Sequence, residues 1–268
     1  MLLTSSWIIG CVAALGLVMK AAIAIEYIIM DEYREGSLVT PQPCCDLQLC
    51  GALEQADLIR LDRLATHISV PARTILFMQG EPAGYFFKVI AGTISLFKLL
   101  PDGRRQILGF TIPGDSLLLS PEGTNAFGAE VIDDAVLWRF DRIQMTQLAD
   151  TNQQMQHLLY ESISHQLIIA QEQCVLLGRL HAEERVTTFL LSMYERFQKI
   201  GRKSITIPLP MARADIADYL GLTVETVSRM ISRIGRKKVL LVVPAGVRIL
   251  DMDRLKAIAL VRTRHKEQ

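Results

Sequence analysis

The stretch DIADYLGLTVETVSR, residues 215–229, decides how the C-terminal third of the chain folds. It predicts two helices joined at Gly221-Leu222-Thr223, because glycine tolerates the left-handed backbone of a sharp turn and a threonine hydroxyl can cap the next helix. Apolar residues at helical spacing predict the inner face that holds the two helices together. These residues are Ile216, Leu220, Val224 and Val227. The arrangement is typical of a helix-turn-helix.

The second helix leaves polar side chains facing outward on its first turns, which enter the major groove of DNA in this motif. Arg229 can donate two hydrogen bonds to guanine, Glu225 can accept one from cytosine, and Ser228 can bond a base edge. A bidentate base contact discriminates by about 1–3 kcal/mol, whereas a surface pair between Glu225 and Arg229 would contribute about 0.2–0.5 kcal/mol. The residues predicted to contact phosphates, which position a protein without reading sequence, are Thr223, Thr226, Arg213, Arg236, Lys237 and Lys238.

Around this motif, residues 181–268 have the outline of a winged helix-turn-helix. A helix is expected at about 182–199, and a short extended piece at 205–208 precedes the first helix of the motif. Two β runs, 239–243 and 247–250, follow the second helix and predict the wing.

Charge separates this module from the rest of the chain. Residues 179–268 carry 18 Lys and Arg against 9 Asp and Glu, whereas residues 1–178 carry 11 against 19. Such asymmetry indicates a basic module for a polyanion joined to an acidic module with another role. The sequence shows no glycine-rich phosphate loop before a helix, no nucleophile elbow and no metal-ligand pair at useful spacing, so an enzyme is not expected.

Upstream, residues 53–141 predict an antiparallel β-roll. A short amphipathic helix opens the segment, with Leu53, Leu58, Leu61 and Leu64 on its apolar side. Short runs rich in β-branched and aromatic residues then alternate with turn signals such as Ala91-Gly92 and Pro113-Gly114-Asp115. The expected strands are 74–77, 85–90, 93–99, 106–111 and 135–140. Many short strands at near-regular spacing are typical of a barrel or roll.

Between these modules, residues 142–180 contain no proline and no glycine before Gly178, which predicts a long helix. Apolar residues recur along it at steps of four and three and form a single row. The row consists of Leu159, Ile163, Leu167, Ala170, Cys174 and Leu177. We expect it to pack against the same helix of a second copy; packing within its own chain is the alternative.

The chain resembles the superfamily of the cyclic AMP receptor protein and the fumarate-nitrate reduction regulator (CRP/FNR), and most closely its FixK-like members. The resemblance extends from about Cys44 to Ala259. The segments that carry it are the roll stretch 79–92, Leu99–Phe110, Ala182-Glu183-Glu184-Arg185 and the helix-turn-helix. It implies an α+β fold in which a cyclic-nucleotide-binding-like β-roll, a long dimerisation helix and a winged helix-turn-helix follow one another.

The resemblance also implies a function: a cytoplasmic, homodimeric transcription activator of anaerobic or microaerobic genes. Glu225, Ser228 and Arg229 match the base-reading positions of the fumarate-nitrate branch, whose palindrome resembles TTGAT-N4-ATCAA. Exposed roll loops such as Pro101–Arg105 could contact RNA polymerase, as they do in related activators. A two-fold dimer would place its two recognition helices about one DNA turn apart.

The resemblance leaves the sensed signal open. A cyclic nucleotide is not expected, because the family's phosphate cassette needs an arginine where this chain has Asn125-Ala126-Phe127. An iron–sulfur cluster would need four thiolates. Cys44 and Cys50 match two of the family's ligands and Cys45 adds a neighbouring thiol, but the remaining positions fall at Pro41 and near Val136. Control without any bound cofactor, as in other FixK-like regulators, is therefore the favoured interpretation; haem, thiol oxidation and an unknown effector remain alternatives.

The N-terminal extension, residues 1–52, contains an apolar stretch, Trp7–Met30, that Lys20 and Glu26 interrupt. Its uninterrupted part, Trp7–Met19, is shorter than the roughly 18 residues expected of a spanning helix, and no basic residue precedes it. We favour a translated upstream stretch with the working start at Met30, and exclude residues 1–29 from the fold. A membrane anchor, which would make the chain a tethered regulator, and an additional ordered helix are the alternatives.

Overall fold

The computed structural model describes residues 55–117, 123–244 and 246–259, all within the unit Pro43–Gln268. The apolar stretch Trp7–Met30 and the candidate cluster cysteines Cys44, Cys45 and Cys50 lie outside the described residues. Among the described residues, no helix is both long and apolar enough to cross a membrane.

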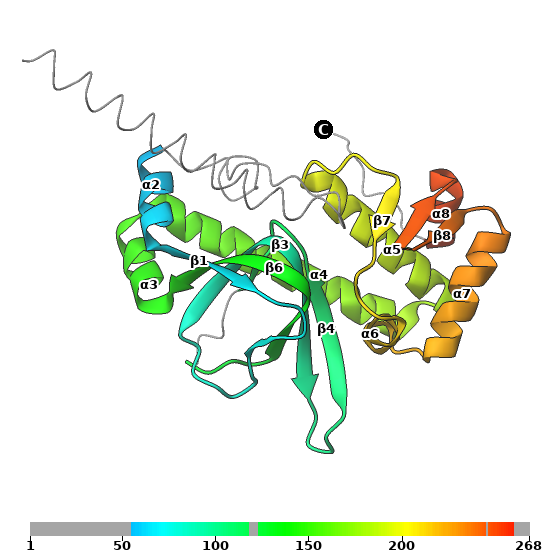
Figure 1. The fold of residues 1–268 in the computed structure, drawn as a ribbon, viewed down its shortest axis with the longest axis horizontal. Helices are drawn as coiled ribbons and strands as arrows, with labels where there is room; N and C mark the ends of the chain where they lie inside the picture. The colour runs from blue at the N-terminus through cyan, green and yellow to red at the C-terminus, as the bar shows by residue number, and fades with distance from the viewer. Residues whose placement is uncertain (1–54, 118–122, 245, 260–268) are drawn as a thin grey trace, which may run out of the picture. The chain divides into compact units, whose positions relative to one another are not determined.

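The first described module is an antiparallel β-roll preceded by a short helix, α2 (Gln55–Leu64) (Figure 1). Its strands are β1 (Ala65–Val70), β2 (Ile75–Phe77), β3 (Tyr85–Leu99), β4 (Arg105–Thr111), β5 (Ser116–Leu117) and β6 (Gly128–Asp141). Strand order is β1-β6-β3-β4, with β2 paired to β6 and β5 paired to β3, and every pairing is antiparallel. The sheet closes around a core that includes Val89, Ile94 and Leu137.

The roll differs from the prediction at Ala91-Gly92, which is not a turn between two strands. β3 continues through it as one strand, with irregular pairing to β6 on both sides of Gly92. Gly92 has φ of +84°, and a Cβ atom there would lie 2.7 Å from backbone and side-chain atoms of Ala135. The glycine therefore permits a β-bulge at which the backbones of β3 and β6 approach closely. In the sequence, a glycine at such a bulge cannot be distinguished from a glycine in a turn.

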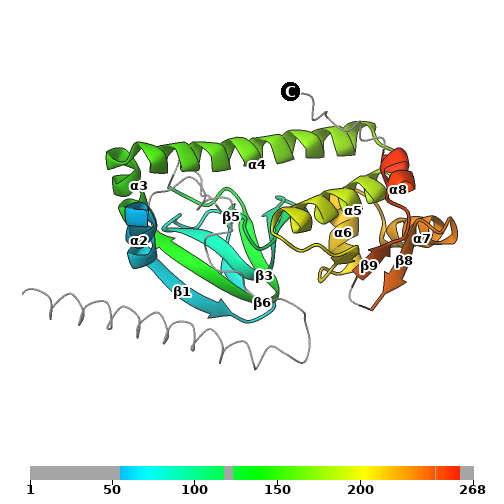
Figure 2. The same cartoon turned by 90° about the horizontal axis from the view of Figure 1, so that it is seen from above.

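The predicted helix over 142–180 is divided into α3 (Arg142–Thr151) and α4 (Gln153–Arg179), which is the long helix in Figure 2. The break falls at Asn152, which has extended backbone and accepts a hydrogen bond from the amide of Met155 (3.0 Å). Asparagine is a strong N-cap, because its side-chain oxygen satisfies an amide at the start of a helix. The prediction of one uninterrupted helix was therefore wrong at this residue.

The C-terminal module contains α5 (Ala182–Lys199), α6 (Arg213–Leu220), α7 (Val224–Arg236) and α8 (Met252–Ala259). A small antiparallel sheet accompanies them, in the order β7-β9-β8. Its strands are β7 (Thr206–Pro208), β8 (Leu240–Val243) and β9 (Gly246–Ile249). This is the predicted winged helix-turn-helix, and α8 is a helix that sequence reasoning did not identify.

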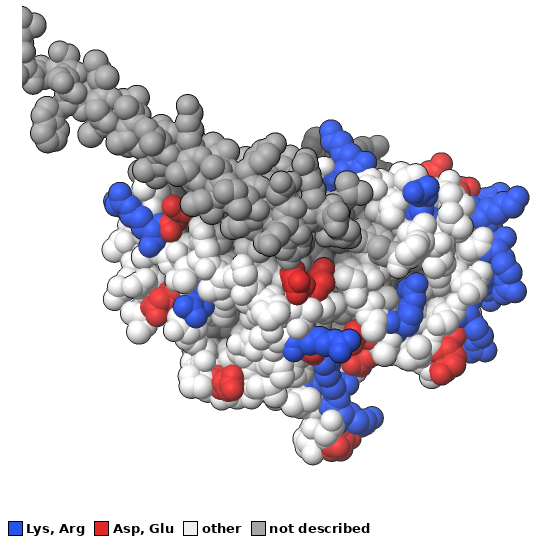
Figure 3. Space-filling model, in the orientation of Figure 1, with Lys and Arg blue, Asp and Glu red and all other residues white. Residues whose placement is uncertain are grey.

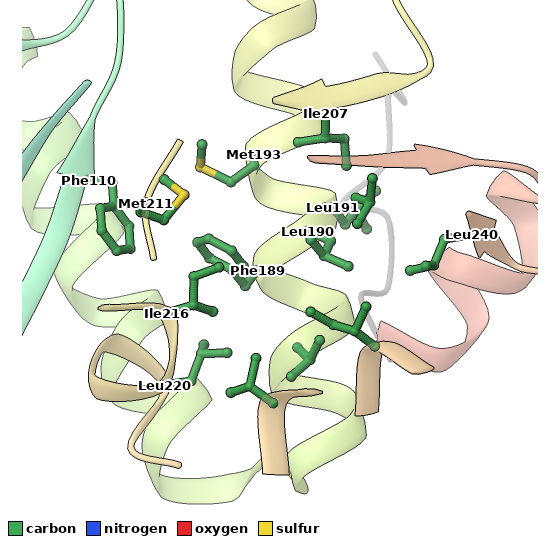
Figure 4. Close-up of a cluster of buried hydrophobic side chains, with 14 of the residues drawn as sticks. Phe110, Phe189, Leu190, Leu191, Met193, Ile207, Met211, Ile216, Leu220 and Leu240 are labelled. Atoms are coloured by element: carbon green, nitrogen blue, oxygen red, sulfur yellow. The ribbon is translucent and has the colours of Figure 1, made fainter. Parts of the chain in front are cut away.

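The core of this module forms around α5, whose buried side chains include Phe189, Leu190 and Leu191. Figure 4 shows these residues between the sheet, which contributes Ile207 and Leu240, and helix α6. On the roll side, the ring of Phe110 from β4 contacts the rings of Phe189 and Tyr219, with centroids 6.0 and 5.4 Å apart. These contacts hold α6 against both α5 and β4.

Candidate nucleic-acid interface

The turn between α6 and α7 has the predicted geometry. Gly221 adopts the left-handed conformation (φ 61°, ψ 41°). The amides of Gly221 and Leu222 donate hydrogen bonds to the carbonyls of Asp218 and Ala217 in the last turn of α6. Thr223 then caps α7, and its hydroxyl accepts the amide of Thr226 (3.2 Å). Glycine and threonine therefore have the roles that their residue types predict.

One residue of the predicted inner face lies elsewhere. Ile216, Leu220 and Val227 are buried, but Val224 is 40% exposed. Val224 is the first residue of α7, and the row that packs inward continues instead from Val227 to Ile231 and Ile234. The middle of α7 thus packs against the rest of the module, and the first turn of α7 is exposed to solvent.

The three predicted base-reading residues, Glu225, Ser228 and Arg229, are all exposed on α7. The guanidinium of Arg229 donates to the hydroxyl of Thr226 (3.2 Å). Hydrogen bonds from its own amide and from the Thr223 hydroxyl hold the pKa of Glu225 below its usual value, and the charge of Arg229 acts in the same direction. The helix therefore presents a charged acceptor and a charged donor one turn apart, free of the protein core.

Basic side chains continue beyond these residues, and Figure 3 shows them along the edge of the molecule where α7 lies. Arg236 and Lys238 are exposed, as predicted for phosphate contacts. Lys237 is exposed as well, but its ammonium pairs with Glu183 of α5 (2.5 Å), which also contacts Arg233 (3.5 Å). Part of the predicted phosphate-binding charge is therefore already neutralised.

Arg213, at the start of α6, is only half-exposed. Its Nη1 atom is buried without a hydrogen-bond partner, and desolvation lowers the pKa of its guanidinium. A buried guanidinium nitrogen without a partner is costly.

The predicted row on α4 is open to solvent in the single chain. Ile163, Leu167, Ala170, Cys174 and Leu177 are exposed, and Leu159 is half-buried. His157 and His165 are also exposed, as expected of helix-surface histidines. No cluster of three or more metal-ligating side chains occurs in the part of the chain that the structure describes.

In the roll, the family's phosphate cassette would begin at Gly114-Asp115 and end near Asn125-Ala126-Phe127, and residues of both segments have other contacts. The carboxylate of Asp115 accepts the amide of Ile112 (2.8 Å) and pairs with Arg196 of α5. Phe127 packs against the roll core, with its ring 6.0 Å from that of Phe77. The segment Asn125-Ala126-Phe127 offers no guanidinium to pair with a cyclic phosphate, which the family's cassette requires.

Sequence reasoning missed Arg185 as a functional residue. Its guanidinium bonds the backbone carbonyls of Leu177, Leu180 and Leu220, so it joins the end of α4 to the end of α6. Its place in the motif Ala182-Glu183-Glu184-Arg185 was the available signal. No local pattern shows which carbonyls the side chain would reach.

Comparisons with known proteins agree with this architecture. Residues 184–258 match the Crp-like helix-turn-helix domain, and residues 67–152 match the cyclic nucleotide-binding domain. The chain is 40% identical over 213 residues to the transcriptional activatory protein AadR of Rhodopseudomonas palustris, covering 80% of this chain and 89% of that protein. It is 36% identical to the nitrogen fixation regulation protein FixK of Bradyrhizobium diazoefficiens, covering 79% and 89%.

Among solved structures, the chain is similar to FixK2 from Bradyrhizobium japonicum. The TM-score is 0.68 at 35% sequence identity, over 72% of this chain and 96% of that one. The fold assigned from sequence is therefore confirmed.

Proposed function

The chain belongs to the CRP/FNR family of DNA-binding transcription regulators, which are not enzymes, and from this premise we propose that it activates transcription as a homodimer on a TTGAT-N4-ATCAA-like palindrome. The proposal extends to genes of anaerobic or microaerobic metabolism, to a contact with RNA polymerase and to action in the cytoplasm. The name of one relative, a transcriptional activatory protein, supports activation.

The observation that carries the DNA part is the composition of the exposed first turns of α7. Glu225, Ser228 and Arg229 are exposed together, while the helix is fixed from below by Val227 and Ile231. An Arg donates two hydrogen bonds to guanine O6 and N7, and a Glu accepts one from the cytosine amino group. A half-site with a G·C pair at its centre, such as TTGAT, offers both.

The exposed row on α4 supports the homodimer. Ile163, Leu167 and Leu177 of this row are 57%, 58% and 38% exposed, so a 27-residue helix presents an apolar strip to solvent. Soluble chains rarely leave such strips uncovered, and a two-fold pair of identical helices covers both at once. The palindrome then matches the symmetry of the protein.

The proposal includes no bound cofactor. The cassette positions of the roll do not fit a cyclic nucleotide, since Asn125-Ala126-Phe127 contains no arginine to pair with the phosphate and Asp115 is already paired with Arg196. Among the described residues the single cysteine is Cys174, so the described part of the roll offers no thiolate for a cluster. Control through the amount of protein present is consistent with a roll of this kind.

The test compares Arg229→Ala with the wild type on labelled duplexes by fluorescence anisotropy. The wild type should lose about 1–3 kcal/mol per half-site when the G·C pair is replaced. Arg229→Ala should lose that preference and keep the preferences at other positions. Arg236→Ala, an exposed residue at the end of the same helix, serves as the control: it should weaken all duplexes alike and reduce the salt slope by about 1. Uniform weakening by Arg229→Ala would contradict its base-reading role.

A further inference from the structure

The C-terminal end of α6 is held by side chains from three other elements. The last carbonyls of a helix have no partner within the helix and must be satisfied from outside. Gln106 of β4 donates to the carbonyl of Asp218 (2.8 Å), and Gln173 of α4 donates to that of Tyr219 (2.7 Å). Arg185 of α5 donates to the carbonyl of Leu220 (3.0 Å). We call these three bonds, made by Gln106, Gln173 and Arg185, the carbonyl clamp.

Arg185 also fixes the end of the long helix. Its Nη2 and Nε atoms donate to the carbonyls of Leu177 (2.9 Å) and Leu180 (2.8 Å), at the C-terminus of α4. One guanidinium therefore lies between the negative ends of two helix dipoles, α4 and α6, where a positive charge is favourable. A Cβ atom on Gly221 would lie 3.3 Å from the Leu177 side chain, so the turn of the motif also contacts α4 directly.

The roll side of the clamp is reinforced by charge. The carboxylate of Asp218 accepts the backbone amide of Ile107 (3.0 Å), next to the Gln106 bond. Arg105 contacts Asp215 (3.6 Å) and Glu130 (2.5 Å), and so links the first turn of α6 to the sheet. Helix α6 is therefore tied at both ends, and its orientation relative to α4 and β4 is fixed.

We propose that the carbonyl clamp sets the spacing of half-sites that the protein accepts, and that Gln106, Gln173 and Arg185 are positioning residues for DNA recognition. This inference rests on the proposed homodimer on a palindrome. α4 carries the apolar row between the two copies, and α7 follows α6 through Gly221. Any tilt of α6 against α4 would therefore change the separation of the two recognition helices, because it would occur in both copies.

The geometry of DNA makes such a setting measurable. One additional base pair between half-sites displaces one of them by about 3.4 Å and rotates it by roughly 35°. In a dimer with a rigid clamp, the recognition helices cannot adjust to both the displacement and the rotation of the half-site. In a dimer whose α6 is loosened, they can. Since the clamp does not touch the bases, its loss should alter the preference for spacing and leave the preference for half-site sequence unchanged.

The test uses Gln173→Glu, which keeps the shape of the side chain but replaces the donor with an oxygen that repels the Tyr219 carbonyl. Arg185→Lys is a second variant, because a lysine cannot hold three carbonyls in one fork. The matched control is Gln166→Glu on the same helix, since Gln166 donates to Ser116 of the roll (2.8 Å) and not to α6. Full-length proteins are titrated by anisotropy against palindromes with spacers from about two to six base pairs, and against a single half-site.

The wild type should prefer a spacer of four base pairs. Gln173→Glu should reduce the ratio of affinities between this spacer and its neighbours by about fivefold, a change of the size expected for one hydrogen bond. Its affinity for the single half-site and its sedimentation as a dimer should remain unchanged, and Gln166→Glu should keep the wild-type ratio.

Each outcome has one meaning. A wild type without an optimal spacer would overturn the proposed palindrome itself. A wild type with an optimum that dimeric Gln173→Glu retains would overturn the clamp and leave the proposed function intact. Equal loss of spacing preference in Gln166→Glu would also overturn it, because the effect would then belong to α4 as a whole. If Arg185→Lys fails to fold, Gln173→Glu alone decides.

Discussion

At the scale of single residues, Asp133 shows how the roll accommodates an acid beside its bulge. Its carboxylate accepts the amide of Thr93 (2.6 Å), one residue after Gly92. Burial raises the pKa of Asp133 above its ordinary value of 3.8, although the hydrogen bonds from Thr93 act in the opposite direction. Ionisation of Asp133 in the folded state therefore lowers the free energy of unfolding.

We expect this cost to appear as a pH dependence of stability that Asp133→Asn removes. Below pH 3.8 the carboxyl is protonated in both states and the charge costs nothing. As pH rises toward the folded pKa, the folded state binds more protons than the unfolded state, so the free energy of unfolding falls. Above the folded pKa the difference is constant. Urea unfolding of both proteins between about pH 4 and pH 7 measures it.

Asp134 provides the matched control for this prediction. It neighbours Asp133 and its carboxylate also accepts a backbone amide, that of Ala72 (2.8 Å), but it is exposed. Asp134→Asn should therefore retain the wild-type pH dependence. A parallel pH dependence in wild type and Asp133→Asn would show that the half-buried carboxyl of Asp133 does not carry the effect.

How far single residues could be predicted depends on the distance to their partners along the chain. Gly221 and Thr223 act within their own turn, so their residue types were sufficient to predict their roles. Gln173 and Arg185 bond carbonyls 46 and 35 residues away. Because every residue has a backbone carbonyl, the sequence does not indicate which one such a side chain will bond. The proposed base-reading residues could be named from the sequence because they project from a local motif; the residues proposed to position that motif could not.

At the scale of elements, the boundary between α3 and α4 depends on one cap. The side chain of Asn152 satisfies the amide of Met155, and its own amide bonds the carbonyl of Ala149 (3.4 Å). The break turns the chain into α4, whose buried residues Met155 and Leu158 pack beneath the roll. A break of this kind needs no proline or glycine, and for that reason the composition of 142–180 did not reveal it.

Replacing this cap should destabilise the protein without affecting the DNA-reading surface. Asn152→Ala should lower the free energy of unfolding by about 1 kcal/mol, the usual cost of losing an N-cap. Asn152→Asp should recover most of it, because a carboxylate accepts the same amide and is favourable at a helix N-terminus. Urea unfolding measures both variants. An alanine variant as stable as the wild type would mean that packing alone sets the break.

Strands were predicted less well than helices for a related reason. β3 runs without interruption from Tyr85 to Leu99, although its sequence contains Ala91-Gly92. The bulge requires a glycine here because Ala135 of β6 lies 2.7 Å from the position that a Cβ atom of residue 92 would occupy. That contact is made across the sheet, so the turn signal and the bulge signal are identical until the pairing is known. In the winged module, elements lie within short range, and apart from α8, which was not predicted, their predicted limits agree closely with the structure.

At the scale of the whole molecule, the proposed function requires an exposed apolar row and an exposed polar helix to act together. The row on α4 would join two copies, and α7 would read one half-site per copy. The carbonyl clamp lies between them, and in our proposal it couples the geometry of one surface to that of the other through backbone carbonyls of α6. The roll contributes through β4, which supplies Gln106 and Arg105 to the same helix.

Dimerisation through the α4 row can be tested at its centre. Leu167 is 58% exposed, and Leu167→Glu would place two carboxylates in the seam between two copies, where they repel each other and lose hydration. We expect this variant to sediment as a monomer at concentrations where the wild type is a dimer. It should lose the additional affinity of the palindrome over a single half-site and keep its affinity for the half-site, because α7 is unchanged.

His165→Glu is the control, because it adds a negative charge at an exposed position of α4 outside the row. It should remain dimeric and bind the palindrome as the wild type does. If Leu167→Glu were also dimeric, a different surface would have to join the copies, and the spacing of the recognition helices would no longer follow from α4. If instead it became monomeric yet bound the palindrome with wild-type affinity, DNA recognition would not require the two-fold seam at all.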